Sequence, residues 1–275
     1  MKKLLTLCFV LCLFGGCQQP SSSNTVAPPP VSEVESGIER ALEISQIEGV
    51  LAARGSGFTR QVAQLIGDPT DEELERIVDA VTVSFAYDSL YLDVKAFLIA
   101  EAPGGFVPTL LSWLEGGAVG QTRAIAEAYD PPVSLEEYMS EFTLEPPSVG
   151  RIQLVRELTE AQAAGDLFVL VQEALREAAH GAWSVLREDA VAFEPLTTSE
   201  LQFDLTNSMA VSVMSLLHRY ETVPDDLIRG AAAEWRSPSG EWYASTYGLA
   251  VAEAIRTAGE RVVASLRAQP VPGLR

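Results

Sequence analysis

The chain has 275 residues, with 38 acidic and 19 basic side chains, and its formal net charge at neutral pH is -19. This length allows one large hydrophobic core or two small ones. The charge argues against a nucleic-acid partner, because phosphate binding depends on basic residues that displace counterions.

The first seventeen residues are typical of a bacterial lipoprotein signal peptide. Lys2 and Lys3 form a positive start, residues 4–14 are apolar, and Gly15-Gly16 are the small residues that precede a cleavage site. The apolar segment is shorter than the roughly 20 residues of a membrane-spanning helix. We therefore predict cleavage before Cys17 and attachment of fatty acyl chains to its thiol. The alternatives are a secreted protein cut elsewhere and an uncleaved anchor.

The residues after Cys17 indicate where the protein would lie and how it would be held. Gln18 occupies a position where aspartate would favour retention in the inner membrane, so we expect the outer membrane, with the protein facing the periplasm. Residues 18–36 are rich in serine and proline and have almost no large apolar side chains, which predicts a flexible tether. A proline-rich ligand for a partner protein is the alternative interpretation.

Beyond the tether, apolar residues recur every three to four positions, which predicts an all-α fold: a bundle of about ten to twelve amphipathic helices. We divide it into an N-terminal half, 37–145, and a C-terminal half, 146–270. Four pairs have the capping-box spacing of a helix start: Ser36 with Glu39, Thr70 with Glu73, Ser134 with Glu137, and Thr197 with Glu200. The predicted helices cover 36–53, 58–66, 71–86, 89–101, 107–115, 119–129, 135–142, 149–163, 167–188, 198–220, 225–235 and 240–267.

Two segments predict sharp corners between consecutive helices. Trp113 precedes Gly120 in one, and Trp235 precedes Pro238 and Gly240 in the other. Each segment lies between a short apolar helix and a longer one, and glycine suits a corner where a Cβ would collide. The tryptophan-to-glycine spacing differs by two residues between the segments. A duplication of the two halves and a coincidence of helical corners therefore both remain open.

The second corner belongs to a longer pattern near the C-terminus. The run Val-Pro-Asp-Asp-Leu at 223–227 precedes Trp235 and the sequence Ser-Pro-Ser-Gly at 237–240. This pattern resembles the signature of the domain of unknown function 2059 family over about 40 residues. The first corner is similar to an upstream segment of some long relatives, although Gly116-Gly117 replace Ser-Pro. The resemblance implies an exported helical bacterial protein and brings no catalytic residue with it.

Motifs for catalysis and cofactor binding are largely missing from the sequence. Glu177 and His180 match the Glu-x-x-His element of di-metal carboxylate bundles, but such bundles need that element twice, and His218 lies in the reverse order. No nucleophile elbow, Walker loop or dinucleotide fingerprint occurs. We therefore predict no catalytic residue, no cofactor and no metal, with Glu177 and His180 as weak metal candidates.

Together these features favour a non-enzymatic module tethered to the membrane through an N-terminal lipid. We expect it to bind an envelope protein, or an apolar ligand in a crevice between its two halves. One alternative is an envelope hydrolase or metal-dependent enzyme that uses His180 and nearby carboxylates. The other is a purely structural envelope protein.

Overall fold

The computed structural model describes residues 31–67, 69–142, 144, 146–187 and 190–268. These residues form helices and no strand, which confirms the all-α prediction. The signal peptide, Cys17 and residues 18–30 lie outside the described part of the chain. The helices are α1 (Val31–Ile44), α2 (Ile47–Leu51), α3 (Arg54–Ile66), α4 (Asp71–Ser84), α5 (Tyr87–Glu101), α6 (Phe106–Gly116), α7 (Ala118–Ala128), α8 (Leu135–Glu141), α9 (Val149–Ala161), α10 (Ala164–Leu186), α11 (Thr198–Arg219), α12 (Asp225–Trp235) and α13 (Pro238–Ala268).

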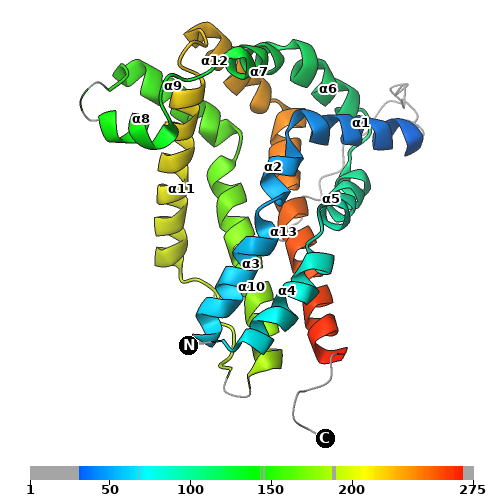
Figure 1. Ribbon diagram of the computed structural model, residues 1–275. Helices are drawn as coiled ribbons and strands as arrows, with labels where there is room; N and C mark the ends of the chain where they lie inside the picture. Colours follow the sequence, from blue (N-terminus) through cyan, green and yellow to red (C-terminus); the bar gives the residue numbers. More distant parts are fainter. Residues whose placement is uncertain (1–30, 68, 143, 145, 188–189, 269–275) are drawn as a thin grey trace, which may run out of the picture.

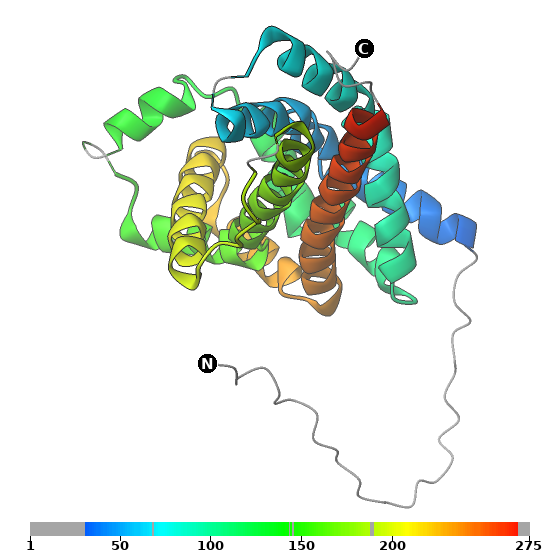
Figure 2. The same ribbon diagram turned by 90° about the horizontal axis from the view of Figure 1, so that it is seen from below.

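The two long helices α10 and α13 lie side by side at the centre of the molecule (Figure 1). Helix α3 packs on α10, while α4 and α5 pack on α13. Helices α6, α7 and α12 gather at one end of this central pair (Figure 1). Seen from below, α11 lies on the side of α10 opposite α13, and α8 lies at the periphery beyond α11 (Figure 2).

Small residues allow α10 and α13 to approach closely. Ala174, Ala178 and Ala182 are buried on α10, and a Cβ on Gly259 of α13 would lie only 2.4 Å from the Ala178 Cβ and 3.1 Å from its Cα. Such close contact strengthens the van der Waals attraction between the two helices. The central pair is therefore specified by residue size as well as by hydrophobicity.

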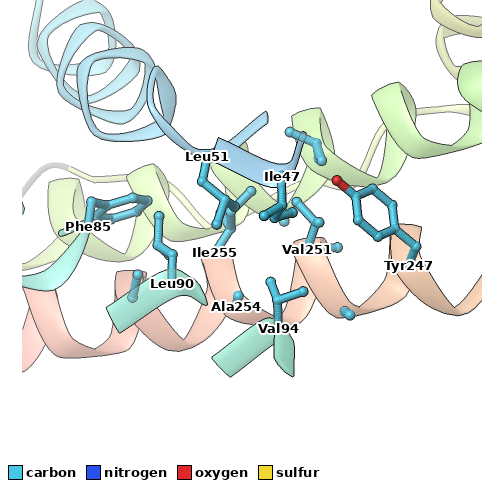
Figure 3. Close-up of a cluster of buried hydrophobic side chains, with 14 of the residues drawn as sticks. Ile47, Leu51, Phe85, Leu90, Val94, Tyr247, Val251, Ala254 and Ile255 are labelled. Atoms are coloured by element: carbon cyan, nitrogen blue, oxygen red, sulfur yellow. The ribbon is translucent and has the colours of Figure 1, made fainter. Parts of the chain in front are cut away.

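The buried apolar side chains form two clusters. The first, larger cluster draws on α1 to α6, α10 and α13, and the second on α7, α9, α11 and α12 with the loop residue Val223. In the first cluster, Ile47 and Leu51 of α2 pack over Val251 and Ile255 of α13 (Figure 3). Because this cluster combines helices from both sides of residue 145, the two predicted halves do not each enclose a core of their own.

Each predicted helix after the first corresponds to one helix of the structure, with ends that differ by up to about four residues. The helix predicted over 36–53 is two helices, because Gln46 adopts a left-handed conformation with φ of 53° between α1 and α2. Helix α1 begins at Val31, so the tether predicted to reach residue 36 is helical in its last part, where Val34 packs against the core. Ser36 accordingly lies inside α1 and caps nothing, which corrects that prediction. The capping boxes of α4, α8 and α11 are confirmed.

Candidate functional site: a pocket between the two cores

The residues expected at helical corners lie together at one end of the bundle. The rings of Trp113 and Trp235 meet edge to face, with centroids 5.2 Å apart. Gly120 and Gly240 are each the third residue of a helix, since α7 begins one residue earlier than predicted and α13 two residues earlier. Pro238 is the first residue of α13, where its missing N–H leaves no helical hydrogen bond unmade. The first corner thus packs directly against the second.

A carboxylate links these two corners. The backbone N–H groups of Ala118 and Val119 each donate a hydrogen bond of 2.8 Å to the Glu234 carboxylate. Glu234 lies at the end of α12, yet it caps the start of α7, where negative charge is favourable. A Cβ on Gly117 would lie 2.3 Å from Glu234 Oε1, so glycine at this position admits the cap. Glu234 could not be predicted from the sequence because its partners, Ala118 and Val119, lie more than a hundred residues away.

A pocket of about 290 Å³ lies beside the corners, between the two core clusters; we call it the seam pocket. Its volume is close to the lower end of the range for small-molecule sites. Residues of both predicted halves line it, from Ile44 to Ala126 and from Gln162 to Tyr247. Four of its lining residues are aromatic, and we call them the aromatic wall: Tyr220, Trp235, Tyr243 and Tyr247.

Two polar atoms of the aromatic wall have no partner. Trp235 Nε1 and the Tyr247 hydroxyl are buried without a hydrogen bond to any described residue. Tyr243, by contrast, shares a hydrogen bond of 2.9 Å with the Ser45 hydroxyl. Burial raises the pKa of the Tyr243 and Tyr247 phenols, so both are neutral at physiological pH. The pocket thus presents neutral polar groups on an apolar surface.

Only two of the described residues that line the pocket carry a charge, Arg123 and Arg219. Arg123 is 27% exposed; its Nη1 donates to the Ile44 carbonyl at 3.5 Å, and its Nε lies 3.8 Å from Glu127 Oε1. Arg219 is exposed at the end of α11. No described aspartate or glutamate lines the pocket. Its wall is therefore positive in a chain whose net charge is strongly negative.

Backbone strain also concentrates at this pocket. Gln46, with φ of 53°, and Ala163, with φ of 50°, are the non-glycine residues with positive φ in the described part of the chain. Gln46 lines the pocket, and Ala163 lies between the lining residues Gln162 and Ala164. Left-handed conformations at such residues cost about 1–3 kcal/mol and cluster at functional sites. Neither residue carries a glycine or asparagine signal in the sequence that could have predicted the turn.

The weak metal candidates do not converge on a shared position. The Glu177 carboxylate accepts a hydrogen bond of 2.9 Å from Arg256 Nε on α13. His180 Nε2 instead lies 2.5 Å from the Val191 carbonyl oxygen, and its ring packs against Trp183. Among the residues that the structure describes, no group of three histidine, cysteine, aspartate or glutamate side chains is placed to hold a metal ion.

Comparison with known proteins gives no significant match to a protein-family model, a curated protein or a solved structure. None of the described helices combines the length and the apolar character needed to cross a bilayer. The chemistry of the seam pocket is therefore the basis for assigning a function.

Proposed function

We propose that this protein is a non-enzymatic lipoprotein of the cell envelope that binds a small amphipathic ligand in the seam pocket. The observation that carries the proposal is the pair of buried, unpartnered polar atoms, Trp235 Nε1 and the Tyr247 hydroxyl, in the wall of an apolar pocket. Leaving such a group unsatisfied costs about 1–3 kcal/mol. A ligand that pairs with these groups while covering the aromatic wall would recover that free energy.

The proposed location supports an amphipathic ligand. Acylation of Cys17 would hold the domain beside a bilayer, and residues 18–30 would separate the lipid from α1 in the sequence. Molecules with an apolar body are concentrated at such a surface. The proposed location is the outer membrane, with the domain facing the periplasm, because Gln18 and not aspartate follows the acylated cysteine.

The enzyme alternative receives no comparable support. It relies on His180 and neighbouring carboxylates, but His180 contacts a backbone carbonyl and Glu177 is paired with Arg256. The role of a purely structural envelope protein would leave the unpartnered polar atoms of the pocket without an explanation. A binding module accounts for the pocket, the strained turns at its rim and the missing catalytic motifs together.

Binding of the neutral apolar fluorophore N-phenyl-1-naphthylamine tests this proposal. The protein is prepared without residues 1–17 and without detergent; this removes none of the described helices, which begin at Val31. We expect saturable binding at one site. Ala164→Leu and Ala244→Leu add bulk to the pocket wall and should each weaken binding at least tenfold.

The matched control is Ala96→Leu, the same change at an exposed position of α5 outside the pocket. It should leave the affinity unchanged. Circular dichroism melting curves verify that each variant remains folded. Binding that does not saturate, or that both pocket variants leave intact, would overturn the proposal.

A further inference from the structure

The charge of the seam pocket is opposite to that of the chain. Acidic side chains outnumber basic ones 38 to 19 overall, yet the described residues lining the pocket include two arginines and no carboxylate. A positive wall of low dielectric attracts a negative group and disfavours a cation. The charge of the pocket lining is therefore complementary to an anion, although the net charge of the chain is strongly negative.

Both arginines have N–H groups available for a ligand. Arg219 is exposed and forms no hydrogen bond or ion pair with a described residue. Arg123 makes only long contacts, at 3.5 Å to the Ile44 carbonyl and 3.8 Å to Glu127. A guanidinium group carries five N–H donors and no acceptor. The charged part of the pocket thus offers donors that lack close partners.

The unpartnered groups of the aromatic wall can also donate hydrogen bonds, as the two arginines can. Trp235 Nε1 can only donate, and the neutral Tyr247 hydroxyl can donate as well as accept. An ionised carboxylate only accepts hydrogen bonds, and its two oxygens match a guanidinium group in geometry. The hydrogen-bonding capacity of the pocket is therefore complementary to a carboxylate.

We propose that the ligand is a single-chain aliphatic carboxylic acid. Its carboxylate would pair with Arg123 and Arg219, and its alkyl chain would lie against the aromatic wall and the side chains of Leu114 and Leu167. This inference rests on the proposed function, because it assigns a ligand class to the same pocket. It goes further by specifying the charge and shape of the head group.

Three probes with the same ten-carbon chain test the head group: decanoate, 1-decanol and decyltrimethylammonium. Their affinities for the protein lacking residues 1–17 are measured by tryptophan fluorescence and by isothermal titration calorimetry. We expect decanoate to bind at least tenfold more tightly than 1-decanol, and the cation to bind most weakly. Raising the salt concentration should weaken decanoate binding and leave 1-decanol binding unchanged.

Substitutions assign the charge to the two arginines. Arg123→Gln and Arg219→Gln should each weaken decanoate binding about fivefold or more and leave 1-decanol binding unchanged. Arg219→Lys should retain most of the affinity because it keeps the charge. Arg60→Gln removes the same charge from an exposed position of α3 outside the pocket and should have no effect.

Two results would overturn the inference, and they differ in what they mean for the proposed function. If 1-decanol bound as tightly as decanoate, and Ala164→Leu and Ala244→Leu weakened both, the pocket would bind ligands without selecting for an anion. If none of the three probes bound in a way that these two variants affect, the proposed function would fail together with the inference.

Discussion

Gly120 and Gly240 occupy equivalent positions in two helical corners: a Cβ on either would lie 2.5 Å from the carbonyl oxygen of the residue five positions earlier. The carbonyl oxygen six positions earlier is also close, at 3.0 Å from the Cβ position of Gly120 and 2.6 Å from that of Gly240. The two corners therefore share a backbone geometry even though their tryptophans occupy different positions in it. The tryptophan-to-glycine spacing conceals this correspondence in the sequence.

Replacing either glycine with alanine should destabilise the fold. The new Cβ would meet backbone atoms, which cannot move away as a flexible side chain can. We expect Gly240→Ala and Gly120→Ala each to lower the free energy of unfolding by about 1–3 kcal/mol in denaturant titrations. Gly150→Ala, at a helical position with open space around it, is the control and should be neutral or slightly stabilising. Equal behaviour of the three variants would contradict the crowded-corner interpretation.

Glu234 provides a second test of how the corners are joined. Glu234→Ala removes the acceptor for the Ala118 and Val119 N–H groups and should lower the free energy of unfolding by about 1–2 kcal/mol. Glu234→Gln keeps an acceptor oxygen but loses the charge, so its effect should be smaller. Glu160→Gln on the exposed side of α9 serves as the control, with an expected change within about 0.5 kcal/mol. A silent Glu234→Ala variant would show that the cap contributes nothing.

Features that depend on residues close in the sequence were predictable, whereas those that depend on distant residues were not. The capping boxes at Thr70, Ser134 and Thr197 were predictable because each depends on residues three positions apart. The break at Gln46 was not, because no residue there favours a left-handed turn; the buried side chains of Ile44 and Ile47 lie on either side of it in the sequence. A crevice between the two halves was expected, but Glu234 and the residues that line the seam pocket could not be identified from the sequence, because their partners come from distant parts of the chain. Helical periodicity predicts that helices pack, and it does not specify which of them meet.

Acylation at Cys17 is open to direct measurement. Membrane fractions of cells that produce the full chain should contain the protein with an N-terminal acylated cysteine, detected by mass spectrometry as an added lipid mass. Cys17→Ser should abolish both the added mass and the membrane association. Cys12→Ser, inside the predicted signal peptide, should leave both unchanged. An unmodified N-terminus in the native product would contradict the proposed anchor and the location that depends on it.

The stability of the protein in acid should depend on its helix caps. Hydrogen bonds from the backbone and side chain of Ser134 lower the pKa of Glu137, and those from the side chain and backbone of Thr197 lower the pKa of Glu200. A carboxyl group with a lowered folded-state pKa stabilises the fold above its unfolded pKa, which lies near 4.5, and this stabilisation disappears as the pH falls through the folded value.

We therefore expect the free energy of unfolding to fall between about pH 5 and pH 3. The double variant Ser134→Ala and Thr197→Ala should start from a lower stability at neutral pH and lose less of it in acid. Urea titrations at a series of pH values measure both slopes. Parallel pH profiles for the two proteins would contradict this account of the caps.

The turn at Ala163 tests whether the rim of the seam pocket is strained. Ala163 has a φ of 50°, where a Cβ is unfavourable, whereas glycine adopts this conformation freely. Ala163→Gly should therefore raise the free energy of unfolding by about 0.5–1 kcal/mol. Ala124→Gly, at an exposed position inside α7, should instead lower it by about 0.5–1 kcal/mol because glycine weakens a helix interior. If Ala163→Gly destabilised the protein as Ala124→Gly does, the left-handed turn at Ala163 would hold no strain. Backbone strain at this residue would then no longer support the seam pocket as a binding site.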